Sequence, residues 1–191
     1  MAIFRNHYTR QGLWTLFLMC ALPLHIWTIF LALRDFDWVT ARTNSWDAVG
    51  VIAYGLVYTF LESLVVFIGA VLLGFLTPAK WEEKRRIALM SVLAAILSLW
   101  SIFNQTYFLN EMPPPAWLAA LAIQTGRPLV TLYAIALFGV TASFAVPAYL
   151  ILKSNRALAV ILEGMDRLAV LMTLYLVFDI AALIIVLIRN L

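Results

Sequence analysis

Two acidic residues and one histidine lie near the middle of long apolar segments, where a charged side chain is costly to hold in a bilayer. Glu62 lies midway along residues 48–76, Asp179 just past the middle of residues 168–188, and His25 at a similar depth in residues 12–33. Carboxyl and imidazole groups can transfer protons and bind cations. The sequence therefore predicts a shared intramembrane polar site formed by these three residues.

The sequence does not specify how the negative charges of the two carboxyl groups are neutralised. No lysine or arginine lies inside an apolar segment, so the acids must be protonated, bridged by a protonated His25, or paired with a partner that supplies positive charge. Supporting hydroxyl groups would come from Tyr58, Ser98 and Tyr175. Hydrogen bonds from such groups could simply hold the helices in register, because a bond of this kind contributes about 0.6–2 kcal/mol in a membrane.

Enzymatic chemistry has little support in the sequence. The HExxH, GxSxG, Walker A and GxGxxG motifs are absent. Cys20 is the single cysteine and His7 and His25 are the only histidines, which excludes an intramolecular disulfide and a cysteine-based metal cluster. His25 with the two acids could bind one metal ion, but it could equally serve proton transfer. We predict no catalytic residue, no metal site and no cofactor.

The composition predicts an all-α polytopic membrane protein. Hydrophobic residues make up 64% of the 191 residues and charged residues 12%, against about 25% charged residues in soluble domains. A helix needs about 20 apolar residues to cross a bilayer. Five segments reach this length, and we predict one domain over residues 1–191 in which they form a bundle. The spans are residues 12–33, 48–76, 87–109, 129–152 and 168–188.

The connections between these spans are expected to be short. In the second outer loop, the prolines at 113–115 should end the third helix, and residues 116–123 should form a short interfacial helix on the outer surface. Inside the bundle, small and polar residues mark helix contacts. On the third helix such residues recur every three or four positions, and we expect this face to point inward: Ser91, Ala94, Ser98, Ser101 and Gln105.

The lysine and arginine residues predict the orientation. With the N-terminus in the cytoplasm, nine lie in inner segments and four in outer segments, which satisfies the positive-inside rule. The inner residues are Arg5, Arg10, Lys80, Lys84, Arg85, Arg86, Lys153, Arg156 and Arg167, and the outer ones are Arg34, Arg42, Arg127 and Arg189. We predict a plasma-membrane protein with an external C-terminus. These basic residues lie in short segments next to the predicted spans, and no folded domain presents them, so we expect no nucleic-acid partner.

Two functions are open at this point. The small size, the odd number of spans and the absence of a soluble domain favour a non-catalytic subunit or assembly partner of a membrane complex. Its partners would be the lipid bilayer and either other membrane-protein subunits or further copies of the same chain. The polar site of Glu62, Asp179 and His25 favours instead a small proton- or cation-linked carrier or channel component. Such a component would need to oligomerise, since five helices enclose little lumen.

Cysteine labelling tests the predicted orientation. In a Cys20→Ser background, Lys84→Cys should react with a membrane-impermeant thiol reagent only after the cells are opened, because the positive-inside rule places this loop in the cytoplasm. Pro114→Cys should react in intact cells. The reverse pattern would invert the orientation and every loop assignment that depends on it.

Overall fold

The computed structural model describes residues 8–78 and 80–191, so Arg5 and His7 lie outside the described residues. In this part of the chain every regular element is an α-helix. The helices are α2 (Arg10–Arg42), α3 (Ser45–Phe75), α4 (Glu83–Leu109), α5 (Ala116–Gln124), α6 (Pro128–Lys153) and α7 (Asn155–Asn190). All of them except α5 are long and apolar enough to cross a membrane. The predicted all-α bundle of five long apolar helices and one short helix is thereby confirmed.

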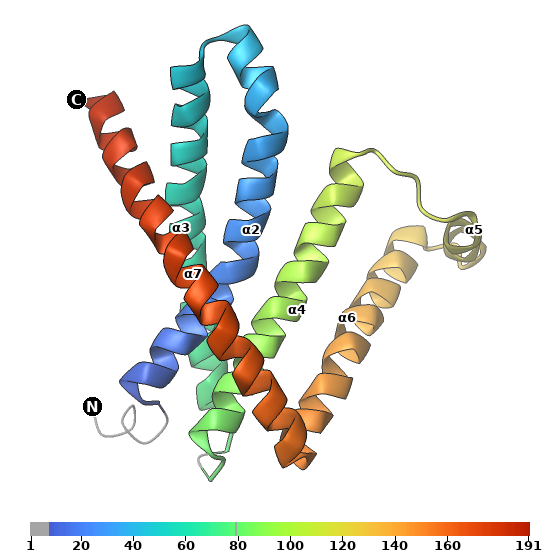
Figure 1. Cartoon of the computed structure of the whole chain (residues 1–191). Coiled ribbons are helices and arrows are strands. Elements are labelled where there is room, and N and C mark those ends of the chain that lie inside the picture. The colour runs from blue at the N-terminus through green and yellow to red at the C-terminus, as the bar shows by residue number, and fades with distance from the viewer. Residues whose placement is uncertain (1–7, 79) are drawn as a thin grey trace.

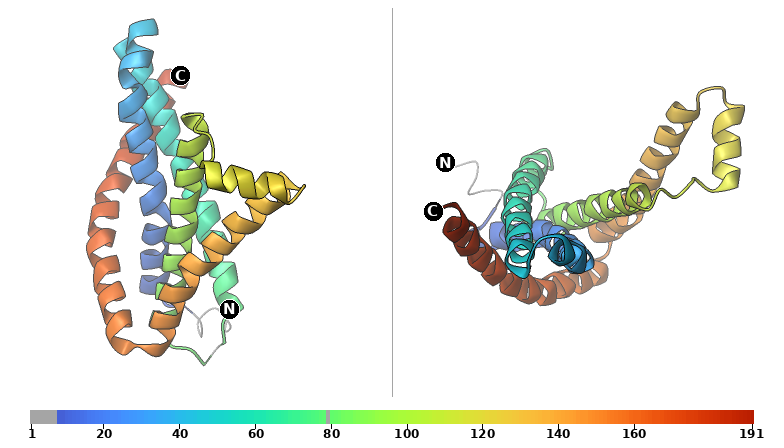
Figure 2. Two further views of the ribbon diagram at one scale, coloured as in Figure 1. Left: turned by 90° about the vertical axis from the view of Figure 1, so that its right-hand side faces the viewer. Right: turned by 90° about the horizontal axis from the view of Figure 1, so that it is seen from above.

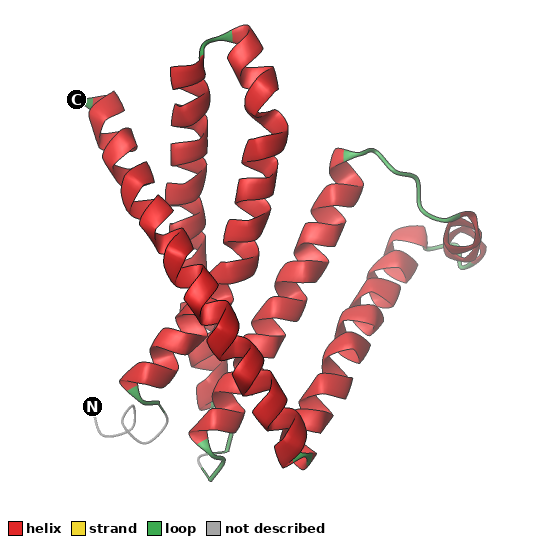
Figure 3. Cartoon of the chain, viewed as in Figure 1, coloured by secondary structure: helices red, strands yellow, loops and turns green. Residues whose placement is uncertain are grey.

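The five long helices alternate in direction along the bundle. Figure 1 shows that α2 begins at one end of the bundle and that α7 finishes at the other. The connections between α2 and α3 and between α6 and α7 are brief turns, whereas an extended segment leads into α5 (Figure 3). The short helix lies across the direction of the long ones, at the outer edge of the molecule (Figure 2). This arrangement brings the middles of α2, α3 and α7 to the same depth.

All five long helices exceed their predicted spans, and α2 and α7 do so by the most. The predicted first outer loop, residues 34–47, is almost entirely helical, and Thr43 and Asn44 alone separate α2 from α3. Residues 34–42 contain no proline or glycine, so nothing interrupts the helix when its composition turns polar. Asn44 begins α3, because its side-chain oxygen accepts a hydrogen bond of 2.8 Å from the backbone N–H of Asp47. Likewise, residues 155–167, which precede the predicted fifth span, form the first turns of α7.

Helix α2 is the central element of the bundle. Residues 16–22 are all buried, which requires neighbours on every side of the helix because seven consecutive residues cover its whole circumference. These neighbours are α3, α4 and α7. The helix bends part-way along its length (Figure 1), and Pro23 lies inside it, where the missing N–H removes one backbone hydrogen bond. Helix α6, by contrast, lies on the flank, and Ile151 is its single buried residue.

The inward face of α4 is shorter than predicted. Ser91, Ala94 and Ser98 are buried, whereas Ser101 and Gln105 are exposed. Toward its C-terminal end α4 diverges from α3 and runs beside α6 (Figure 1). Gln105 still contacts α2 there, because its side-chain oxygen accepts a hydrogen bond of 2.6 Å from the Trp27 indole. Trp100 contacts α6 there, and its indole N–H donates a hydrogen bond of 3.0 Å to the Ser143 hydroxyl.

Enlarging the buried face of α4 should destabilise the bundle. Ser98→Phe should lower the unfolding free energy by about 1–3 kcal/mol through overpacking, and this would appear as a lower melting temperature in lipid nanodiscs. Leu99→Phe is the matched control, because Leu99 is 59% exposed on the same helix. Equal shifts for the two variants would contradict the assignment of the buried face.

Candidate functional site

His25 and Asp179 form a buried pair between α2 and α7. The imidazole Nε2 lies 2.9 Å from Asp179 Oδ2 and 3.1 Å from Oδ1. The other ring nitrogen, Nδ1, lies 2.9 Å from the backbone carbonyl oxygen of Ala21. His25 is fully buried, and Asp179 is 8% exposed. Two residues separated by 154 positions in the sequence thus share a hydrogen bond in the middle of two apolar helices.

This geometry fixes how many protons the pair holds. A carbonyl oxygen can only accept, so the Nδ1 atom of His25 must carry a hydrogen and donate it to Ala21. The Nε2 atom faces the carboxyl group of Asp179, and one proton must lie between them for a hydrogen bond to form. The pair is therefore an imidazolium with a carboxylate, or a neutral imidazole with a carboxylic acid. Its net charge is zero in both cases, so Asp179 needs no further cation.

Close packing of α3 against α7 places Asp179 opposite His25. Ala53, Leu56 and Ala182 form a small buried cluster where these two helices meet. At the end of α7, the Arg189 guanidinium donates to the Trp46 carbonyl and to Asp47 Oδ1, each at 2.7 Å. These contacts anchor the last turns of α7 to the first turn of α3.

Glu62 does not join this pair. Its side chain is exposed, and it has no hydrogen bond or ion pair with any residue that the structure describes. The buried positions nearby are Thr59, whose hydroxyl lies 2.5 Å from that of Thr28, and Ser63, whose hydroxyl donates to the Thr59 carbonyl. Residue 62 is turned about 100° from Ser63 around the helix axis. The structure brings together two of the three predicted residues and leaves the third on the outer face of α3.

The three predicted supporting residues do not contact the acids. Tyr58 is 66% exposed and lies one turn from Glu62, whereas Ser98 is buried on α4. Tyr175 is partly buried one turn before Asp179, and its ring packs 6.4 Å from that of Phe178. Among the described contacts, none of their hydroxyl groups bonds to Glu62 or Asp179. Among the described residues, Asp179 bonds to His25 only. The two residues lie 154 positions apart, and their spacing in the sequence does not identify them as partners.

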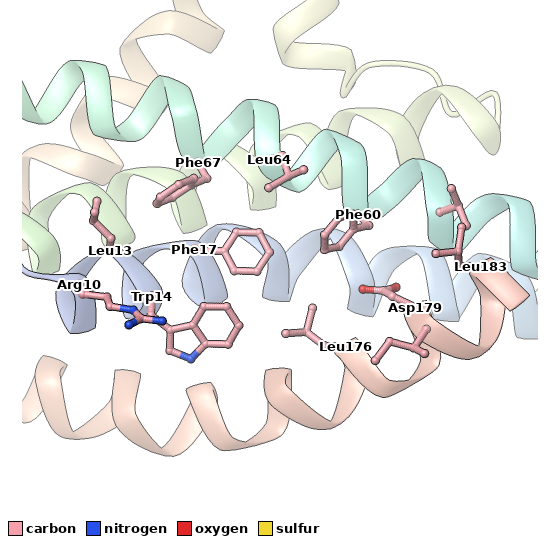
Figure 4. A pocket seen from close by; sticks show the side chains of 12 residues that line it. Arg10, Leu13, Trp14, Phe17, Phe60, Leu64, Phe67, Leu176, Asp179 and Leu183 are labelled. Carbon is pink, nitrogen blue, oxygen red and sulfur yellow. The ribbon is translucent and has the colours of Figure 1, made fainter.

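A groove of about 880 Å³ runs between α3 and α7 over the surface of α2. Figure 4 shows Arg10 beside Trp14 at one end and Asp179 toward the other, with Phe17, Phe60 and Phe67 between them. Arg10 and Asp179 are the two charged residues in an otherwise apolar lining. This groove could not be predicted from the sequence, because its lining residues are spread over three helices.

Two arginines that the sequence analysis counted only as orientation signals have structural roles. Arg86 is 1% exposed, and its Nε–H donates a hydrogen bond of 2.8 Å to the Thr77 hydroxyl. The Arg86 guanidinium also lies 5.7 Å from the ring centre of Tyr8. Burial raises the pKa of the Tyr8 hydroxyl, although the charge of Arg86 opposes this. Arg85 donates to the carbonyls of Ile151 and Leu152 at 2.7 and 3.1 Å, and so caps the end of α6.

The described residues contain no group of three or more His, Cys, Asp and Glu side chains that could hold a metal ion. His25 and Asp179 offer two ligands, which suits proton sharing better than metal binding. Comparisons with protein-family models, curated proteins and solved structures found no match.

A double-mutant cycle should show strong coupling between His25 and Asp179. His25→Leu strands a buried carboxyl group, and Asp179→Leu strands a buried imidazole, so each should cost on the order of 3 kcal/mol of unfolding free energy. The double variant should cost clearly less than the sum, because neither polar group remains. Unfolding in detergent micelles would give the four free energies.

The neutral hydrogen bond between Thr28 and Thr59 provides the control for this cycle. Thr28→Val and Thr59→Val should show a coupling of about 0.6 kcal/mol, as is usual between membrane helices. Additive effects at His25 and Asp179 would show that the two side chains do not interact in the folded protein.

Proposed function

We propose that this protein is a non-catalytic subunit or assembly partner of a membrane complex. Its binding surface is the outer face of α3, and the partner is a membrane helix that brings a basic side chain to Glu62. The observation that carries the proposal is the position of Glu62, which is exposed near the middle of a 31-residue apolar helix.

A comparison of the two acids supports this assignment. Asp179 meets His25 within the chain, whereas Glu62 has no ionic or hydrogen-bonding partner among the described residues. A carboxylate on a lipid-facing surface requires protonation or a cation. The predicted spans contain no lysine or arginine, and the one histidine among them is already fully buried against Asp179. A second copy of this chain therefore has no cation to offer at this depth, and the proposed partner is a different protein.

The surroundings of Glu62 suit a packed helix. Exposed apolar side chains flank it along the same helix, including Leu61 at 51% and Val65 at 70% exposure. Tyr58, one turn away, offers a hydroxyl that could bond to either member of an ion pair. An acid at one defined position in an apolar surface fixes the register of a partner helix, as single buried polar residues do in coiled coils.

Binding of a designed transmembrane peptide tests this proposal. A leucine–alanine helix of roughly 20 residues with one central lysine should associate with the protein in liposomes, measured by energy transfer between labels. The same peptide with a central glutamine should bind at least fivefold more weakly, because it cannot pair with the carboxylate. Glu62→Gln should abolish the preference for lysine over glutamine.

Glu163→Gln is the matched control. Glu163 is an exposed acid near the start of α7, and it pairs with Arg167. This variant should retain the preference for the lysine peptide. Equal binding of both peptides to the unaltered protein would overturn the proposed partner. Self-association that depends on Glu62 would instead indicate a homo-oligomer.

A second function is favoured by one observation. Asp179, which shares a proton with His25, also lines the groove that runs toward Arg10, so the pair could serve a proton-linked carrier. In proteoliposomes carrying an imposed pH gradient, such a carrier would move protons, and Asp179→Asn would stop the flux while preserving the fold. Absence of flux in the unaltered protein would leave the subunit role as the better account.

A further inference from the structure

We propose that the groove between α2, α3 and α7 binds one acyl chain of an anionic phospholipid, with the lipid headgroup at Arg10. This inference is independent of the partner site, because Glu62 is not among the residues that line the groove. The volume of about 880 Å³ falls within the range of about 300–1,000 Å³ that ligand sites occupy.

The length of the groove matches one leaflet of a bilayer. Its lining on α3 extends from Val57 to Phe67, which is about 15 Å at a rise of 1.5 Å per residue. Half of a hydrocarbon core of about 30 Å is the same distance. A chain that enters beside Arg10 therefore runs past Phe17 and Phe60 toward Asp179 and Leu183.

The charge at the open end selects the headgroup. Arg10 is exposed at the first turn of α2 and makes no hydrogen bond or ion pair with a described residue, so its guanidinium is available to a phosphate. Trp14 lies one turn further along and is 51% exposed, as expected for a side chain at the boundary between headgroups and acyl chains. A zwitterionic headgroup also carries a phosphate, but its own ammonium group offsets that charge, so an anionic headgroup gains more from Arg10.

The deep end accepts a hydrocarbon terminus without a further polar contact. Asp179 is the acid in the lining, and its carboxyl group already bonds to His25 Nε2. The remaining walls are aromatic and aliphatic side chains, of which Leu64 and Leu176 lie on α3 and α7 and are partly buried. A flexible acyl chain can follow such an apolar lining and contact it along its length.

Photo-crosslinking in nanodiscs tests this site. Phosphatidylglycerol carrying a diazirine on one acyl chain is added to the intact protein in phosphatidylcholine nanodiscs, and labelled peptides are mapped by mass spectrometry. Labels should concentrate on Phe17, Phe60 and Leu64. Unlabelled phosphatidylglycerol should compete about fivefold better than phosphatidylcholine, which is the factor that one basic residue contributes at an anionic surface.

Two variants separate the headgroup from the chain. Arg10→Gln should keep the labelling of the groove but lose the preference for phosphatidylglycerol, whereas Arg156→Gln, an exposed arginine at the start of α7, should keep both. Leu64→Trp fills the groove and should remove the labelling, and Leu72→Trp, on an exposed part of α3, should not. Size-exclusion profiles show whether each variant remains folded.

Three results would overturn the proposal. Labelling spread evenly over all exposed helices would indicate ordinary boundary lipid, and equal loss of preference in the Arg10 and Arg156 variants would indicate general surface charge. An unlabelled groove in the unaltered protein would show that no phospholipid chain enters it.

Discussion

An apolar bundle offers a charged side chain almost no water, and each ionisable group in its interior must therefore find a partner or become neutral. His25 and Asp179 satisfy this constraint together. Because Ala21 holds the Nδ1 hydrogen of His25, the remaining nitrogen can share one proton with Asp179, and the pair stays neutral. This pair joins the central helix to the last one in the chain, so the position of α7 depends on it as well as on apolar contacts.

The position of α7 also determines the groove. Near its end, α7 lies against α3 through Ala182 and the Arg189 contacts, and closer to its start the lining residues of α3 and α7 stand apart over α2 (Figure 4). Asp179 lines the groove together with Ile180 and Leu183, which follow it on α7. The crossing of α7 over α3 therefore provides a tight contact at Ala182 and, beside it, an open apolar groove that includes Asp179.

The sequence predicted the elements better than their contacts. Length and apolarity identify five helices because the bilayer imposes both requirements on each helix separately. The inward faces depend on neighbours. Ser91, Ala94 and Ser98 are buried as expected, whereas Ser101 is exposed, although Gln105 one turn further along still bonds to Trp27 on α2. The same limit applies to the polar site. The sequence predicts a similar membrane depth for His25, Asp179 and Glu62. Depth does not specify, however, which side of its helix a residue occupies. Glu62 is turned by about 100° around the helix axis from the buried Ser63 and therefore lies on the surface.

The exposed position of Glu62 favours the proposed subunit role over the carrier role that the sequence left open. A charged residue at the centre of a membrane helix costs about 2.5–3.5 kcal/mol, whereas leucine there is favourable by about 0.5 kcal/mol. A hydrogen bond from Tyr58, at about 0.6 kcal/mol, offsets little of that difference. A carrier would place its acids around a shared pathway, as Asp179 is placed beside the groove, but Glu62 lies outside the groove. An ionised acid that faces outward needs a cation on whatever binds that face, and in the proposed complex a basic side chain on the partner helix would supply it at the required depth.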